Sequence, residues 1–325
     1  MTQIKKNTVT NPITRKEMIK GGAALSAALM AGAAIPGNIF GKRKFIGKAV
    51  QNGRIKQVLV SWPFMAFGDQ WTLDQLCQAA VNLGLEGIEL VGPEEWPTMK
   101  KYGLVCGMAT NGMPDPPYVK GLNNPRYRDE VIALTKKRIE ECAEAGVKNV
   151  ITFTGFEHRD LDNPDAGIIP ADEGADYTVA GLKELALHGE KHDVTICMEH
   201  LNSRVSDDDS RGHPGYQGDD IDYCADIIRR VGSSHAKLLF DIYHVQIMNG
   251  DIIARIKEYG TDLIGHIHTA GVPGRRELDN EQELSYPAIM EALIEIGYEG
   301  YVGQEFIPTR DPMEGLREAV DLCDV

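Results

Sequence analysis

Acidic residues and one histidine stand at the ends of short apolar runs in this sequence. The set comprises Glu89, Glu199, Asp241, His268 and Glu305. Carboxylates and imidazoles ligate divalent metals and move protons at neutral pH. Three carboxylates that converge in a buried place repel one another unless they are protonated or bound to a cation. We therefore predict that Glu199, Asp241, His268 and Glu305 hold one divalent ion, and Mn²⁺, Mg²⁺, Co²⁺ and Zn²⁺ all suit these ligands.

The elements that would bring these residues together alternate regularly along the chain. Apolar, strand-like runs occupy 56–61, 87–90, 104–108, 149–154, 194–199, 237–241, 263–268 and 301–306. Apolar residues recur with the periodicity of an α-helix in 72–83, 94–101, 125–145, 176–192, 219–231, 246–258, 285–296 and 312–323. Eight strand–helix units predict a single (β/α)8 TIM barrel of the α/β class, whose strand ends form one rim. A doubly wound open sheet is the alternative fold, but no glycine-rich phosphate loop follows the first strand.

The first 37 residues have the pattern of an export signal. A basic stretch precedes a Gly/Ala-rich apolar run at 21–35 and a short small-residue zone. Residues 14–20, TRKEMIK, resemble a twin-arginine export motif in which Lys16 stands at the second arginine. The apolar run is too short for a stable membrane span. We expect an exported, periplasmic protein, with the signal at 1–37, a basic linker at 38–54 and the barrel at 55–325.

The net charge of −14 averages two unlike parts of the chain. The segment up to Arg54 holds ten basic residues and one acid, so 24 basic and 47 acidic residues follow it and give −23. Such a charge excludes nucleic acid and anionic membrane as main partners. We expect a small-molecule partner, a sugar or hydroxy-keto substrate, and a homo-oligomer is compatible with the sequence. The six cysteines lack metal-ligand spacing and are interpreted as buried free thiols.

Four longer motifs carry a family resemblance. They are MEHLN at 198–202, FDIYH at 240–244, HIHTAGVPGR at 266–275 and GYEGYVGQEFIP at 297–308. Together they resemble the hydroxypyruvate isomerase branch of the xylose-isomerase-like barrels, the sugar isomerase and epimerase superfamily. The similarity extends over essentially the whole of 55–325.

The resemblance implies roles for individual residues. Glu199 and Glu305 match two glutamates that hold the metal, face each other across the substrate and act as the acid/base pair. Asp241 and His268 match the residues that complete the coordination. Hydroxypyruvate isomerases tend to carry Gln at the His268 position, whereas ketose epimerases carry His.

The resemblance also concerns the residues around the metal ligands. His244 and Arg275 match positions that contact substrate oxygens.

Other residues have two interpretations each. Trp62, one of four aromatic residues after the first two strands, either supports a sugar ring or packs in the core. Glu89 either binds substrate or caps the following helix. His266 is interpreted as a core histidine one layer below His268. His188 and His192 are spaced like a metal-binding pair, but their polar helix favours a surface position.

The predicted activity is isomerisation or epimerisation through an enediolate. A proton α to a carbonyl leaves at neutral pH only if the developing oxyanion is stabilised, which a metal provides. One glutamate removes the proton, and the same or the opposite glutamate returns it to the neighbouring carbon or to the other face. Two alternatives remain, an endonuclease IV-type metal-dependent phosphodiesterase and a non-catalytic exported sugar-binding barrel.

Overall fold

The structure, a computed structural model, describes residues 47–325 of the 325-residue chain. The predicted export signal at 1–37 and most of the predicted linker at 38–54 lie outside these described residues. None of the helices that the structure describes is long and apolar enough to cross a membrane. The six cysteines are all unpaired, and all except the half-buried Cys106 are buried, as predicted.

Eight parallel strands form one curled sheet in the order β3-β2-β1-β8-β7-β6-β5-β4. The strands are β1 Lys56–Val60, β2 Gly87–Glu89, β3 Val105–Cys106, β4 Asn149–Phe153, β5 Thr195–Glu199, β6 Ala236–Asp241, β7 Ile264–Thr269 and β8 Tyr301–Gln304. Just after β3, Ala109 pairs in parallel with Val150 of β4. The Ala109 amide donates to the carbonyl of Asn149, and its own carbonyl accepts from Ile151. These bonds close the sheet, so the predicted α/β barrel is confirmed.

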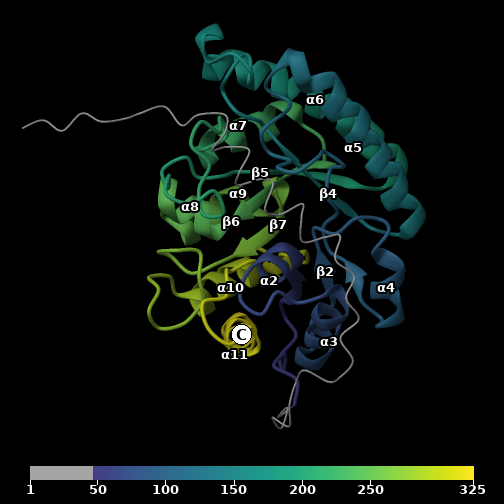
Figure 1. Cartoon of the computed structure of the whole chain (residues 1–325), viewed down its shortest axis with the longest axis vertical. Helices are drawn as coiled ribbons and strands as arrows, with labels where there is room; N and C mark the ends of the chain where they lie inside the picture. The colour runs from purple at the N-terminus through teal and green to yellow at the C-terminus, as the bar shows by residue number, and fades with distance from the viewer. Residues whose placement is uncertain (1–46) are drawn as a thin grey trace, which may run out of the picture. The chain divides into compact units, whose positions relative to one another are not determined.

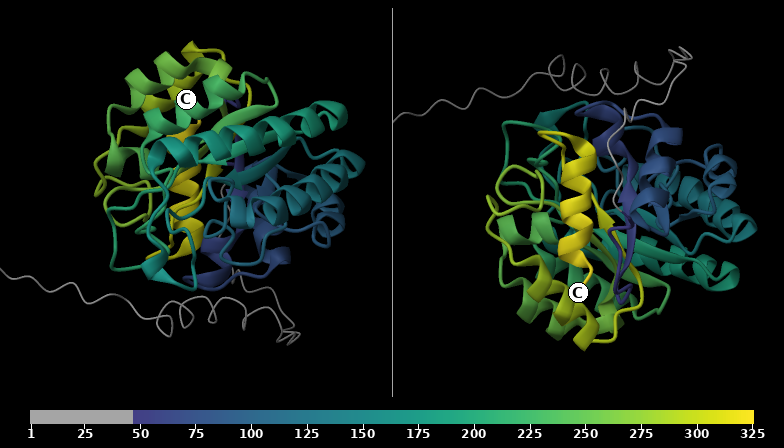
Figure 2. Two further views of the ribbon diagram at one scale, coloured as in Figure 1. Left: turned by 90° about the horizontal axis from the view of Figure 1, so that it is seen from above. Right: turned by 90° about the horizontal axis from the view of Figure 1, so that it is seen from below.

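Helices surround the sheet, as Figures 1 and 2 show. They are α2 Ser61–Ala66, α3 Leu73–Leu83, α4 Trp96–Lys101, α5 Pro125–Ala145, α6 Ala171–His192, α7 Ile221–Val231, α8 Ile242–Met248, α9 Ile252–Leu263, α10 Tyr286–Glu295 and α11 Pro312–Cys323. Left-handed glycines such as Gly84, Gly146 and Gly232 end α3, α5 and α7 just before the next strand. The helices therefore bury their apolar faces on the sheet and leave the carboxyl ends of the strands to the loops.

One predicted helix, 246–258, is wrong. The structure has two helices there, because α8 starts directly after β6 and ends before Gly250 and Asp251, whose φ angles are 66° and 54°. Left-handed backbone at two successive residues cannot continue an α-helix. The short α8 therefore stands over the rim of the barrel, immediately after Asp241.

The two ends of the described chain are bound to each other. The Asp324 carboxylate accepts hydrogen bonds from the backbone amides of Gln51 (2.5 Å), Asn52 (2.7 Å) and Gly53 (2.8 Å). As a result, residues 47–54 run beside the end of α11 (Figure 2). This contact lies at the amino ends of the strands, on the face opposite the predicted catalytic rim.

Candidate active site

The four predicted metal ligands come together at the carboxyl ends of the last four strands. Glu199 ends β5, Asp241 ends β6, His268 lies in β7 and Glu305 directly follows β8. Each offers one ligand atom, and these four atoms all lie within 4.8 Å of one another. The exposed fractions of the four residues are 5%, 1%, 0% and 3% in chain order. The structure thus places three carboxylates and one imidazole in a single buried cluster.

Several atoms of this cluster lack a hydrogen-bond partner. His268 Nδ1 lies 3.0 Å from Glu305 Oε2 and 3.6 Å from Glu199 Oε1. All three atoms are buried and none has a partner in hydrogen-bond geometry, although a terminal nitrogen of Arg275 lies 2.7 Å from Glu305 Oε2. Buried polar atoms without partners are costly and rare in proteins. A set of three carboxylate oxygens and one imidazole nitrogen fits a divalent ion, which would satisfy them together.

The two carboxylate oxygens of Asp241 make different contacts. Its Oδ1 caps α8, accepting from the backbone amides of Tyr243 (2.8 Å) and His244 (3.4 Å). Its Oδ2 faces the cluster and lies 3.3 Å from a terminal nitrogen of Arg275. The cap explains why β6 changes into a helix at this residue, and it orients the second oxygen toward the other ligands.

The surroundings of Glu199 and Glu305 shift the pKa values of these two carboxyl groups in opposite directions. Burial and the charge of Glu305 raise the pKa of Glu199, and the same two causes raise the pKa of Asp241 to about 8. Burial also opposes ionisation of Glu305, but the charges of Arg275 and His268 outweigh it and lower the pKa of Glu305. Burial lowers the pKa of His268, yet the Glu305 charge and the surrounding carboxylates raise it well above the ordinary value. Carboxylates in one site with pKa values displaced in opposite directions are typical of acid–base centres.

Glu89 lies beneath the cluster instead of capping a helix. Its Oε1 is 3.0 Å from His268 Nε2 and its Oε2 is 2.8 Å from His266 Nε2. All three residues are buried. Burial raises the pKa of Glu89, but the charges and hydrogen bonds of His266 and His268 outweigh it and lower this pKa. Glu89 therefore faces one ring nitrogen of His268 while the other nitrogen faces the carboxylates.

Gly303 makes room for Glu89. A Cβ atom at Gly303 would lie 1.9 Å from Glu89 Oε1 and 2.9 Å from His268 Cδ2. No side chain fits at either distance, so the strand β8 approaches Glu89 only because this residue is glycine.

We expect the Gly303→Ala variant to be less stable by about 1–3 kcal/mol, because its methyl group must displace Glu89 or the β8 backbone. Urea denaturation measures the free energy of unfolding. In the double variant Gly303→Ala, Glu89→Ala the closest clashing atom, Glu89 Oε1, is gone, so its cost should be smaller than the sum of the two single costs. Simple additivity would contradict the proposed contact.

Arg275 lies inside the cluster. A terminal nitrogen is 2.7 Å from Glu305 Oε2, and the guanidinium lies 5.0 Å from the ring centre of Trp62 and 5.4 Å from that of Tyr243. Its other terminal nitrogen donates to the carbonyl of Ser210 (3.0 Å) in the 205–216 loop. Arg275 has a φ of 55°, an unfavourable conformation for a long side chain, which these contacts maintain. It thus joins the ligands to the loop over the rim.

Trp62 also contacts the cluster directly. Its indole Nε1 donates a 2.7 Å hydrogen bond to Glu305 Oε1. This leaves Oε2 of Glu305 toward His268 and Arg275. The indole therefore fixes the orientation of the carboxylate.

His244 is held in one tautomer. Its Nδ1 accepts from the backbone amide of Asn202 (3.0 Å), and the Asn202 side-chain amide lies 2.7 Å away. Burial and the charge of Arg275 lower the pKa of His244 well below the ordinary value. The neutral ring therefore carries its proton on Nε2, which has no hydrogen-bond partner and lies 3.5 Å from Asp241 Oδ2. A substrate oxygen at this point would find a hydrogen-bond donor.

Two residues that contact His244, Asn202 and His213, were not among the predicted site residues. Asn202 fixes the tautomer of His244, and His213 packs 5.7 Å from the His244 ring and 4.3 Å from Tyr118 between ring centres. His213 directly precedes the PGY of the 205–216 loop, and this position was the only available signal.

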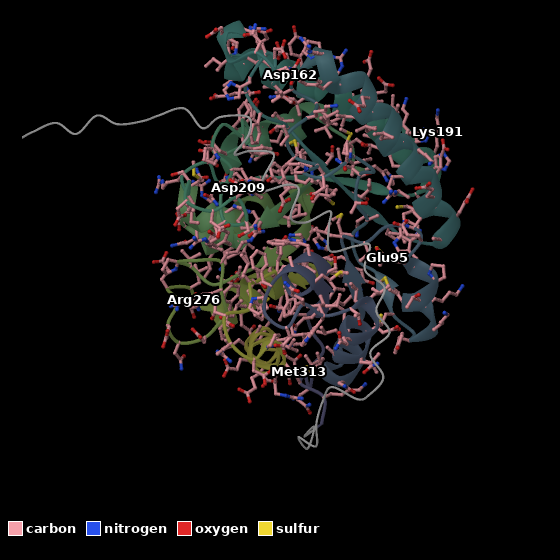
Figure 3. All side chains as sticks on the ribbon, viewed as in Figure 1. Glu95, Asp162, Lys191, Asp209, Arg276 and Met313 are labelled. Atoms are coloured by element: carbon pink, nitrogen blue, oxygen red, sulfur yellow. The ribbon has the colours of Figure 1, made fainter. Side chains whose placement is uncertain are left out.

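A cavity of about 600 Å³ adjoins this cluster without containing its ligands. It is lined by residues of two loops and of α8, namely Val205, Asp207 and Arg211, Val272, Pro273, Gly274 and Arg276, and Tyr243 and Ile247. Figure 3 labels Asp209 and Arg276 on these two loops. The cavity lies on the rim, and the buried cluster lies beyond Tyr243 and Arg275.

Comparison with known proteins identifies relatives over most of the chain. The family model of xylose isomerase-like TIM barrels matches residues 77–324. The 2-oxo-tetronate isomerase of Cupriavidus necator is 29% identical over 258 residues, 78% of this chain and 93% of that protein. The putative hydroxypyruvate isomerase of Homo sapiens is 34% identical over 161 residues, and this match spans 46% of the chain and about half of the relative (55%).

Solved structures show the same fold. An AP endonuclease of family 2 from Brucella melitensis has a TM-score of 0.67 at 20% identity, over 81% of this chain and 97% of that one. The 3-keto-D-glucoside 4-epimerase of E. coli has a TM-score of 0.64 at 20% identity, over 82% of this chain and 97% of that one. At this identity the similarity establishes the barrel and not the reaction.

Proposed function

We propose, because the chain belongs to the xylose isomerase-like TIM barrel family, that it is a metal-dependent isomerase or epimerase of a sugar or small hydroxy-keto compound. One observation carries the proposal. The ligand atoms of Glu199, Asp241, His268 and Glu305 lie within 4.8 Å of one another in a buried cluster. Relatives named as isomerases over most of this chain support the same class of reaction.

A divalent ion bound by these four residues would stabilise the negative charge that develops on the substrate oxygens. Glu305 is suited to remove the proton next to the carbonyl, because Arg275 and His268 favour its charged form and Trp62 orients it. Glu199 stands on β5, three strands away in the sheet, and is suited to return the proton through its raised pKa.

The remaining polar groups position the substrate. His244 presents its Nε2–H toward the cluster, and Arg275 presents a buried guanidinium beside Glu305. Both are donors, and both are suited to bind the hydroxyl or carbonyl oxygens of an enediolate. Return of the proton to the neighbouring carbon gives an isomer, and return to the opposite face of the same carbon gives an epimer.

The two alternative functions receive less support. A phosphodiesterase acting on DNA needs a basic groove, whereas the chain after Arg54 has a net charge of −23. A non-catalytic sugar-binding barrel does not need two carboxylates with oppositely displaced pKa values beside a metal site.

Two measurements test the proposal together. Metal analysis of the purified protein should find at least one equivalent of a divalent ion, and substrate screening in ²H₂O should find exchange at a carbon next to a carbonyl. The screen should include ketoses, aldoses and hydroxy-keto acids. Binding without exchange across the whole panel would favour the non-catalytic barrel, and cleavage of abasic DNA would favour the phosphodiesterase.

We expect Glu89→Gln to weaken metal binding by about 10–100-fold, because a metal-bound histidine depends on the acceptor at its second nitrogen. Gln keeps the size of Glu89 but loses the charge that faces His266 and His268. Competition with a chromophoric chelator measures the affinity. Glu86→Gln is the matched control, because Glu86 is exposed and directly precedes the strand that carries Glu89. Equal affinities in both variants would show that Glu89 does not support the site.

A further inference from the structure

A second group of metal-ligating side chains lies on the outside of the barrel. It comprises Glu140 on α5 and His188 and His192 on α6, and we call it the outer cluster. One ligand atom from each residue lies within 4.8 Å of the others. Glu140 is exposed and the two histidines are half-buried, so the outer cluster is open to solvent. It shares no residue with the buried cluster.

The register of the two helices creates the outer cluster. His188 and His192 are four residues apart and therefore project from the same face of α6. Their ring centres are 4.6 Å apart. The helices α5 and α6 pack side by side (Figure 1), and His188 Nε2 lies 3.1 Å from Glu140 Oε1. One turn earlier on both helices, Lys136 and Glu184 form a 2.6 Å ion pair.

The repeated spacing shows that this contact belongs to an ordered interface. The Lys136–Glu184 pair and the Glu140–His188 pair both join residues 48 positions apart. Parallel helices with a constant offset bring the next pair into contact at every turn. The position of Glu140 relative to the two histidines is thus set by helix packing along α5 and α6.

The three ligands suit a transition metal. Two histidines and one glutamate are a known zinc ligand set, with bonds of about 2.0–2.1 Å. Bonds of that length in a tetrahedron separate the ligand atoms by roughly 3.3 Å. The 3.1 Å between His188 and Glu140 already matches this value. Imidazole nitrogens favour Zn²⁺, Ni²⁺ or Cu²⁺ over Mg²⁺, which takes oxygen ligands.

We propose that Glu140, His188 and His192 form a second metal site, which binds Zn²⁺ or a similar transition-metal ion and joins α5 to α6. The ion links two long helices that are otherwise held by packing and by exposed ion pairs, which contribute little. Binding therefore stabilises this side of the barrel without taking part in the reaction. The site is independent of the proposed activity, since none of its residues contacts the buried cluster.

The test uses the full-length protein after treatment with a chelator. Zn²⁺ titration should show two binding events in the unaltered protein. His188→Gln and His192→Gln should each abolish the outer event, with affinity lower by more than about 100-fold, and leave the buried one. His235→Gln, which alters a half-buried histidine outside both clusters, is the matched control and should keep both events. Asp241→Asn should weaken only the buried event, so failure of one site is distinguishable from failure of the other.

A second measurement reports the link between the helices. Hydrogen exchange of the backbone amides in α5 and α6 should slow when Zn²⁺ is added, and this protection should vanish in His192→Gln. Mg²⁺ should not produce it. The proposal is overturned if His188→Gln and His192→Gln both bind as many equivalents of Zn²⁺ as the unaltered protein, with the same affinities, or if Zn²⁺ leaves the exchange of both helices unchanged.

Discussion

Replacing Glu199 or Glu305 by glutamine is expected to lower the rate of proton exchange between substrate and solvent by about 10²–10⁴-fold, the usual contribution of a general acid or base. Glutamine keeps the shape of each side chain and an oxygen for the metal, but it cannot accept the proton. The measurement is deuterium incorporation from ²H₂O into the substrate that the screen identifies.

The two glutamine variants need a control for metal loss. Metal content should therefore be determined in the same samples, and exchange compared at equal occupancy. Glu190→Gln, which removes an exposed carboxylate on α6, should leave the rate unchanged. If both Glu199→Gln and Glu305→Gln exchange protons at the unaltered rate with metal bound, the two-glutamate mechanism is wrong.

Removal of the metal is expected to abolish activity completely and to lower the melting temperature. Without a cation, Glu199, Asp241 and Glu305 depend on His268 and Arg275 alone for compensating charge. A ligand at 100 times its dissociation constant stabilises a folded protein by about 2.7 kcal/mol. Differential scanning calorimetry with and without chelator measures the change, and readdition of a divalent ion should restore both stability and exchange. An active chelated protein would show that the metal is not needed.

The metal affinity should also rise between about pH 6 and pH 8. The pKa of Asp241 without metal is raised to about 8, and that of His268 is raised as well, so both residues hold protons that metal binding must displace. At higher pH fewer protons compete, and the apparent dissociation constant falls. Affinity that is constant over this range would contradict the inclusion of Asp241 and His268 among the ligands.

The ligand set was predictable because it follows from topology. Residues at the ends of parallel strands in a barrel must share one rim, so the positions of Glu199, Asp241 and His268 required only that the strands be recognised. The apolar runs were long enough for that, and the structure confirms eight parallel strands. The predicted roles of these residues in metal binding and proton transfer remain proposals.

The surroundings of the ligands were not predictable in the same way. Arg275 contacts Glu305 and donates a hydrogen bond to the Ser210 carbonyl in the 205–216 loop. Both contacts depend on loop conformations, which no periodic sequence pattern encodes. The contact between Glu89 and His268 depends on the register of β2 against β7 across the barrel and on Gly303. The two interpretations of Glu89, substrate binding and helix capping, did not include its contacts with His266 and His268.

The export signal stays a prediction, since residues 1–37 lie outside the described part of the chain. The break between α8 and α9 was missed because the apolar spacing of 246–258 continues through it. Only the succession Asn249, Gly250 and Asp251 indicates a turn there, and the last two of these residues have positive φ angles.

The bond between Asp324 and residues 51–53 has a consequence for how this barrel can be handled. With its ends in contact, the described chain is close to a ring, and its starting point is topologically arbitrary. The ends meet on the face away from the proposed catalytic rim, so a fusion partner or a surface attached there would leave that rim open to solvent. A change in what is attached at this face therefore need not alter the loops at the carboxyl ends of the strands.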